Sequence, residues 1–174
     1  MNSATDHQLA AVIILAAGEG KRMKSARPKF LHPVAGRSIL HRVLDAATGL
    51  RPEHVAVVVG NGRDQVEAHL DEVAPHAVRV AQGDEAYGTG YAAQCAMAAL
   101  PDLHGDVVIT VGDAPLQDSD ALAALVATHR DAGAVATVLT ATAPDPTGYG
   151  RIVRGADGAV TAIVEHKDAT PEQQ

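Results

Sequence analysis

The sequence predicts an α/β fold in which a mostly parallel sheet is flanked by helices. Short apolar runs rich in β-branched residues alternate along the chain with segments of helical spacing, an order typical of parallel sheets wrapped by helices. The first apolar run leads directly into a glycine-rich, cationic loop. With 174 residues, 47% of them apolar, the chain is long enough for one domain with a core of its own.

Each expected element follows from its local pattern. Strands are predicted at residues 11–16, 55–59, 78–81, 106–111 and 134–142, and the first, second and fourth of these are nearly continuous β-branched runs. Helices are predicted at residues 39–48, 63–73, 91–100 and 119–132, the last with Ser119 as its cap. The resulting fold is Rossmann-like, and such sheets place ligands at the carboxyl ends of their strands.

The loop after the first strand has the composition of a phosphate-binding loop. Gly18 and Gly20 permit positive φ angles and let backbone N–H groups approach a phosphate closely. Local positive charge on a chain of net charge −7 indicates an anionic ligand at one place rather than affinity for nucleic acid. A solvated basic loop is the alternative interpretation. The cations of this loop are Lys21, Arg22, Lys24, Arg27 and Lys29.

Two common phosphate motifs are excluded. A dinucleotide fingerprint needs a third glycine where Met23 stands. A Walker loop needs Ser or Thr where Arg22 stands, and a glycine where Leu15 stands. The loop therefore belongs to another nucleotide-binding design.

Three regions are expected along the chain. Residues 1–10 form a polar tail, residues 11–143 the nucleotide-binding α/β core, and residues 144–174 the beginning of a smaller, incomplete β part. In that β part, segments 151–154 and 160–164 are joined by Gly155-Ala-Asp-Gly158, which predicts a hairpin.

Cysteine count and hydropathy predict a cytoplasmic location and no membrane partner. Cys95 is the single cysteine, so the chain has no disulfide framework. No apolar run approaches the ~20 residues of a membrane span. Residues 1–9 are polar and lack a signal-peptide core. The nine histidines lack zinc-ligand spacing.

Asp113 is the strongest candidate outside the loop. It follows an apolar strand and Gly112, so it stands at the carboxyl end of that strand. A carboxylate there can hold Mg²⁺ against phosphate oxygens, because Mg²⁺ takes few protein carboxylates and completes its shell with phosphates and water. The alternative is that Asp113 only orders the turn before Pro115.

Five sequence blocks occur in order, and together they resemble a known family. They are Leu15-Ala-Ala-Gly-Glu-Gly-Lys-Arg-Met-Lys-Ser25 with Pro28-Lys-Phe-Leu-His32, Gly88-Thr-Gly90, Val111-Gly-Asp-Ala-Pro-Leu116, Gly148-Tyr-Gly-Arg-Ile-Val-Arg154 and Ile163-Val-Glu-His-Lys-Asp-Ala-Thr170. The set resembles the sugar-phosphate nucleotidyltransferases, and within them the uridylyltransferase domain of the bacterial bifunctional N-acetylglucosamine-1-phosphate uridylyltransferases.

The resemblance implies that UTP and N-acetylglucosamine 1-phosphate are converted to UDP-N-acetylglucosamine and pyrophosphate for cell-wall precursor synthesis. It implies catalytic roles for Arg22 and Lys29, Mg²⁺ bound by Asp113, and sugar binding by Gly150 and Glu165. A tight turn at Gly150 and an exposed Glu165–Lys167 pair are the alternatives. The residues implied in nucleotide binding are Leu15, Ala16, Ala17, Gly18, Gln82, Gly88 and Thr89.

The chain also departs from the family pattern. Lys21 stands in place of a threonine, Tyr91 in place of a histidine, and Gln82 lies six rather than five residues before Gly88. The sequence ends at Gln174, before the asparagines that in the family serve the acceptor sugar and the metal, so a fragment or a shortened relative is expected. The homo-oligomer of the family, a trimer, relies on a β-helix acetyltransferase domain outside this chain.

Two other functions stay open at this point. One is a related nucleotidyltransferase of different specificity, such as the guanylyltransferase for the molybdenum cofactor. The other is a nucleotide-binding module without turnover, because part of the acceptor half lies outside the chain.

Overall fold

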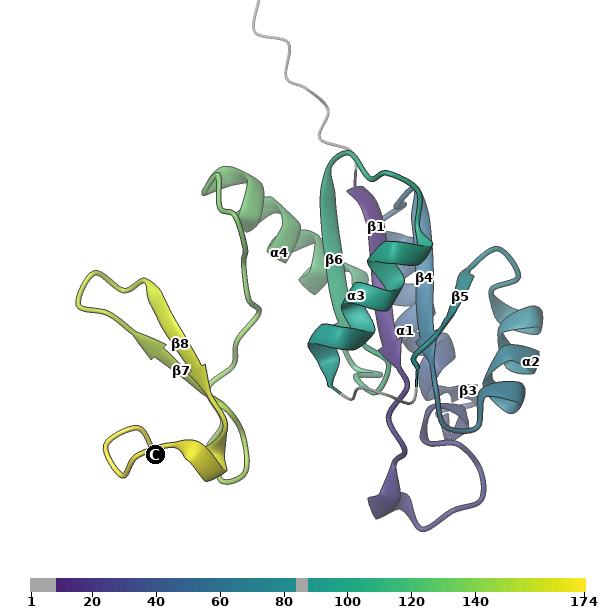
Figure 1. Cartoon of the computed structure of the whole chain (residues 1–174), viewed down its shortest axis with the longest axis horizontal. Helices are drawn as coiled ribbons and strands as arrows, with labels where there is room; N and C mark the ends of the chain where they lie inside the picture. Colours follow the sequence, from purple (N-terminus) through teal and green to yellow (C-terminus); the bar gives the residue numbers. More distant parts are fainter. Residues whose placement is uncertain (1–8, 84–87) are drawn as a thin grey trace, which may run out of the picture. The chain divides into compact units, whose positions relative to one another are not determined.

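Four parallel strands form the central sheet, in the order β5-β4-β1-β6 (Figure 1). The structure is a computed structural model that describes residues 9–83 and 88–174. The chain divides into two units, the first ending at Ala134 and the second running from Val135 to Gln174. The strands of the central sheet are β1 (Leu9–Ala16), β4 (His54–Val59), β5 (Val78–Ala81) and β6 (Asp106–Val111).

The strand order reverses beside β1. The chain passes from β1 to β4 and β5 on one side and then returns to place β6 on the other side of β1. In the ladders, Val12 is paired with Val55 of β4 and with Val108 of β6. Ligands of open parallel sheets bind at such a reversal, beyond the carboxyl ends of the strands.

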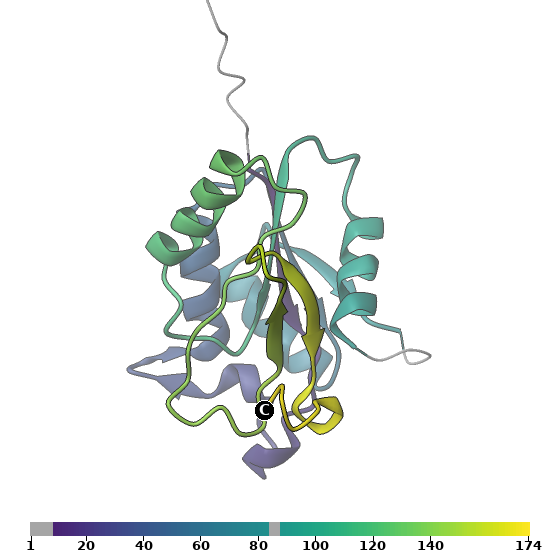
Figure 2. The same ribbon diagram turned by 90° about the vertical axis from the view of Figure 1, so that its left-hand side faces the viewer.

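Helices cover both faces of this sheet, which explains the unbroken apolar run of β1. Val12 and Ile14 lie in one buried cluster with residues of α1, α2 and α4, whereas Ile13 lies in a second cluster with Ala92 and Ala96 of α3. Figure 2 shows α1 and α4 on one side of the sheet and α3 on the other. The helices are α1 (Ile39–Gly49), α2 (Arg63–Val73), α3 (Thr89–Ala99) and α4 (Ser119–Asp131).

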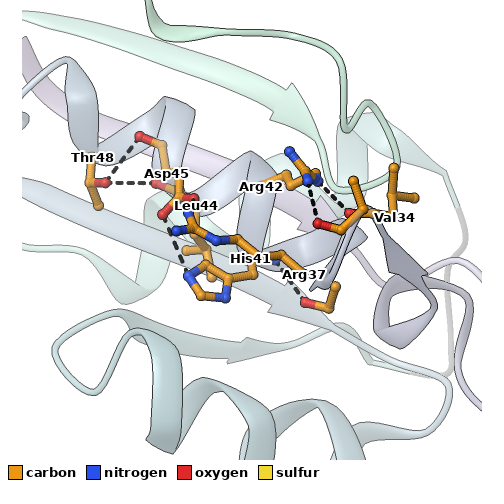
Figure 3. A network of polar contacts seen from close by, with 9 residues as sticks. Val34, Arg37, His41, Arg42, Leu44, Asp45 and Thr48 are labelled. Atoms are coloured by element: carbon orange, nitrogen blue, oxygen red, sulfur yellow. Dashed lines mark hydrogen bonds and ion pairs between the residues drawn. The ribbon is translucent and has the colours of Figure 1, made fainter.

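A short hairpin between β1 and α1 is tied to that helix by charged side chains. The intervening elements are the 3₁₀ turns η1 (Lys21–Met23) and η2 (Lys29–Leu31) and the strands β2 (Pro33–Val34) and β3 (Arg37–Ser38). Arg42 of α1 donates to the carbonyl oxygens of Val34 at 2.7 Å and Ala35 at 3.0 Å (Figure 3). Arg37 donates to Asp45 at 2.6 Å. These bonds fix the hairpin, and with it the chain that leaves η2.

The second unit contains the predicted hairpin. Strands β7 (Arg151–Arg154) and β8 (Val160–Val164) pair antiparallel, with Ile152 opposite Ile163. A 3₁₀ turn, η3 (His166–Asp168), follows β8. Within the described residues, no helix has the length and apolarity needed to cross a membrane.

Three sequence predictions about the elements are corrected. Residues 134–142 form no strand, and the side chain of Val135 is fully exposed, because alternating apolar residues without a partner strand gain no ladder hydrogen bonds. The cap of α4 is Asp118, whose carboxylate accepts from the N–H of Ala121 at 2.8 Å, rather than Ser119. Helix α3 begins at Thr89 rather than at residue 91.

A histidine links the two helices α1 and α2. The ring of His69 lies 2.7 Å from the hydroxyl of Ser38, which caps α1 by accepting from the N–H of His41. Burial lowers the pKa of His69 below the ordinary value of 6.5; nearby Glu72 opposes this shift and His41 adds to it. Burial in the fold therefore disfavours the protonated form of His69.

We expect the burial of His69 to make stability depend on pH. The unfolded chain protonates His69 near its ordinary pKa, whereas the folded chain does so only at lower pH, so the free energy of unfolding falls as the pH drops below 6.5. Urea unfolding at about pH 7.5 and about pH 5.5 should show a smaller loss for His69→Gln than for the wild type. Equal losses in the two proteins would contradict the role given to His69.

Candidate functional site

The four strand ends surround one cavity. Because the strands are parallel, the loops that leave β1, β4, β5 and β6 lie at the same edge of the sheet. The cavity has a volume of about 490 Å³, within the range of small-molecule sites. Its lining residues are Leu15, Ala17, Gly18, Glu19, Lys29, Phe30, Gly60, Asn61, Gln82, Gly83, Gly88, Thr89, Ala92, Val111 and Asp113.

Most of the residues predicted to bind a nucleotide lie in this lining. Ala16 is the exception, since its side chain is fully buried in the core beside α1. A Cβ added at Gly18 or at Gly88 would meet nothing within 4 Å, so both backbones border open space. Of the two loop glycines, Gly20 has a positive φ of 65°, whereas Gly18 has none, which corrects that expectation.

The position of Lys29 is fixed by the packing of its sequence neighbours, Pro28 and Phe30. Pro28 is buried against Gly62, where a Cβ would lie 2.5 Å from the proline ring and where φ is 68°. Phe30 is 2% exposed and belongs to the core. The stem of Lys29 lies against Gly20, where a Cβ would come within 2.7 Å of the lysine Cβ. The backbone of Lys29 is therefore held in place, and its long side chain reaches into the cavity.

Asp113 lies at the end of β6, opposite Lys29. The N–H of Gly112 donates to the carbonyl oxygen of Leu15 at 2.8 Å, which joins the end of β6 to the end of β1. The ammonium group of Lys29 contacts Oδ2 of Asp113 directly, although 84 residues separate them. The two side chains are 25% and 36% exposed, so the pair remains reachable by a ligand. The structure thus brings together the predicted catalytic lysine and the predicted metal ligand.

The donor set fits a metal that arrives with phosphate. Within the described residues, no group of three His, Cys, Asp or Glu side chains is placed to hold a metal by itself. Asp113 supplies one carboxylate in a cavity that is also lined by Glu19. Mg²⁺ is commonly held by one or two carboxylates, with substrate phosphates and water completing its shell.

Among the predicted residues of the first unit, Arg22 also lies outside the lining of this cavity. Arg22 lies in η1 and is exposed, because left-handed residues at Gly20 and Lys24 bend the loop at both ends of that turn. Gly150 and Glu165 belong to the second unit, on either side of the β7–β8 hairpin, and both are exposed.

Several lining residues were missed by sequence reasoning. They are Glu19, Phe30, Gly60, Asn61, Gly83, Ala92 and Val111. The Gly60-Asn-Gly62 triplet could have been found, since it directly follows an apolar strand, the same signal that identified Asp113. Phe30 and Ala92 carry no such signal, because their side chains are ordinary core residues that also border the cavity.

Fold and site together define a nucleotidyltransferase domain. The family model of the MobA-like NTP transferase domain matches residues 12–167, which is most of the chain. The chain therefore belongs to the MobA-like NTP transferase family.

Proteins named bifunctional protein GlmU are similar to almost the whole chain. The relative from Thermobifida fusca (strain YX) is 54% identical over 169 residues, covering 95% of this chain and 35% of the relative. The relative from Streptomyces avermitilis is 56% identical over 167 residues, covering 95% of this chain and 34% of the relative. The chain thus spans about a third of the length of the relatives it matches. The resemblance to bacterial bifunctional enzymes is confirmed.

Solved structures of low sequence identity share the fold. A 4-diphosphocytidyl-2C-methyl-D-erythritol synthase from Anaerococcus prevotii has a TM-score of 0.63 and 20% identity, covering 94% of this chain and 66% of that one. Rv0371c from Mycobacterium tuberculosis, solved as a complex with manganese, has a TM-score of 0.55 and 21% identity, covering 72% of this chain and 60% of that one. These likenesses confirm the predicted α/β fold class.

We expect Gly62→Ala to disturb Lys29 as well as the fold. An alanine at φ 68° costs about 1–2 kcal/mol of stability, and its Cβ would also displace Pro28. Gly133→Ala is the matched control, because Gly133 also has a positive φ of 54° but open space around its Cβ. Urea unfolding should show a loss for both variants and the larger loss for Gly62→Ala, because only its Cβ meets Pro28, whereas calorimetric titration should show weaker pyrophosphate binding only in Gly62→Ala. Equal pyrophosphate affinities in the two variants would contradict this account of how Lys29 is positioned.

Proposed function

We propose that the chain transfers a uridylyl group from UTP to N-acetylglucosamine 1-phosphate and releases pyrophosphate. The observation that carries the proposal is the cavity in which Lys29, Asp113 and the open backbone at Gly18 and Gly88 lie together. The similarity of 95% of the chain to bifunctional GlmU proteins supports the same reaction.

The reaction needs positioning and charge neutralisation more than proton transfer. A phosphate oxygen of the sugar 1-phosphate attacks the α-phosphorus of UTP and forms a new P–O bond. The bond from the α-phosphorus to the bridging oxygen breaks, and pyrophosphate leaves with that electron pair. Since the nucleophile is already an anion, no general base is required, and the barrier is lowered by orientation and by cations near the leaving group.

Each residue has a task in this step. The backbone from Leu15 to Gly18, together with Gln82, Gly88 and Thr89, binds the nucleoside. Lys29 bridges phosphates at the reacting centre, and Arg22 contacts the outgoing pyrophosphate. Gly150 and Glu165 bind the sugar, Gly150 through its backbone and Glu165 by accepting hydrogen bonds from hydroxyl groups.

Asp113 would hold Mg²⁺ against the phosphates of UTP. The ion would neutralise phosphate charge and polarise the α-phosphate, which favours attack by another anion. Asp113 is suited to this role because it lies at the carboxyl end of β6 in the cavity, directly across from Lys29.

We expect Lys29→Gln to lower turnover by about 10²–10³, the typical loss when one preorganised donor to a developing charge is removed. The lysine side chain lies outside the buried core, so thermal unfolding should change little. Arg51→Gln is the matched control, since Arg51 is an exposed cation that precedes β4 and lies at the opposite end of the strands. Pyrophosphate release measures turnover in all three proteins. Near wild-type turnover in Lys29→Gln would contradict the proposed role of the lysine.

A guanylyltransferase is the second candidate. It is favoured by the MobA-like family model, and Gln82 lies six residues before Gly88, one more than in the uridylyltransferase pattern. We expect thermal-shift titration to show tighter binding of UTP than of GTP, CTP or dTTP, because the backbone around Leu15 and Gly88 is proposed to read uracil. A stronger shift with GTP would contradict the uridylyl specificity and favour the second candidate.

A further inference from the structure

The direct contact between Lys29 and Asp113 suggests how nucleotide and metal binding are coupled. We propose that Lys29 serves as an internal counter-cation for Asp113 in the nucleotide-free protein, so that the lysine and a divalent cation compete for one carboxylate. Nucleotide phosphate withdraws the lysine, and the carboxylate then accepts the metal. The identity of these ligands rests on the proposed function.

The pair is built by the fold rather than by chance contact of surface chains. Lys29 is fixed by the packing of Pro28 on Gly62 and of Phe30 in the core. Asp113 is fixed by the hydrogen bond that joins the ends of β1 and β6. Two anchored backbones thus place opposite charges at contact distance. Most exposed ion pairs are weakened by the conformational entropy that is lost when the pair becomes ordered. Here the backbones are already held in place, so mainly side-chain entropy is lost.

A divalent ion and the lysine would use the same carboxylate. In the described part of the chain, Lys29 is the cation in contact with Asp113, and it contacts Oδ2. A metal that uses Oδ2 must displace the ammonium group, and a metal bound through Oδ1 alone still meets repulsion from the charge of that group. A partly exposed ion pair is a modest obstacle, so we expect competition to lower metal affinity by about two- to fivefold rather than to prevent binding.

The lysine can leave without rearranging the fold. Its stem is flexible and its ammonium group carries three donors, which suits it to phosphate oxygens. The ammonium group also lies 5.7 Å from the centre of the Phe30 ring, which attracts a cation. Rotation of the Lys29 side chain therefore suffices to exchange Asp113 for a phosphate, while Pro28 and Phe30 keep the backbone in place.

Binding of Mn²⁺ alone tests the proposal, with free Mn²⁺ measured by electron paramagnetic resonance and no nucleotide present. Lys29→Met should bind Mn²⁺ about two- to fivefold more tightly than the wild type, because the competing charge is removed. The gain should disappear in the double variant Lys29→Met/Asp113→Asn. Arg51→Met, which removes an equal charge away from the cavity, should bind Mn²⁺ as the wild type does.

Three results would overturn the proposal: Mn²⁺ affinity in Lys29→Met equal to or below that of the wild type, a gain of the same size in Arg51→Met, or a gain that survives Asp113→Asn. Lys29→Gln is a second test of the same prediction if the methionine variant does not fold. The assay involves neither UTP nor turnover, so its outcome is independent of whether the chain transfers a uridylyl group. If the chain showed no transfer activity, a measured competition between Lys29 and Mn²⁺ would still be valid. If no competition were measured, the proposed transfer reaction would be unaffected.

Discussion

The burial of β1 between two parallel neighbours is the constraint on which the site depends. Every residue from Ala10 to Ile14 is completely buried, so both faces of the strand must be covered by helices. The ladders pair Leu15 with Val111 of β6 and Ala16 with Val59 of β4, and so they align the strand ends. The pairing of Val59 with Ala81 aligns the end of β5 as well, so four loops leave the sheet at one edge, and the cavity between them follows from strand pairing.

Charge is arranged around that cavity in a way that the overall composition conceals. The chain has a net charge of −7, yet the loop after β1 concentrates cations, and Lys29 carries one of them to the end of β6. A lysine and a carboxylate in contact carry no net charge as a pair. Each group presents its full charge to a ligand only when phosphate or metal separates the two groups. In the proposed function, ligand binding and catalysis draw on the same two side chains, and the proposed competition makes the order in which ligands arrive determine which charge is available.

Continuous apolar runs in the sequence correctly predicted the strands that are buried on both faces of the sheet. The strand at residues 11–16 and the position of Asp113 at a strand end follow from a continuous apolar run and a following glycine. Alternation failed at residues 134–142, because a strand also needs a partner and the sequence does not reveal one. The contact of Lys29 with Asp113 was invisible, since it depends on packing such as Pro28 against Gly62 between distant segments.

A time course by ³¹P nuclear magnetic resonance tests the central claim most directly. The chain is mixed with UTP, N-acetylglucosamine 1-phosphate and Mg²⁺, and all phosphorus species are followed in one sample. The account predicts that the signals of UDP-N-acetylglucosamine and pyrophosphate grow in equal amounts, and only when both substrates are present. The contradicting result has two parts: UTP shifts the unfolding temperature of the chain, but the phosphorus signals of UTP stay unchanged in the presence of the sugar phosphate. The chain would then bind the nucleotide without transferring a uridylyl group, which contradicts the account.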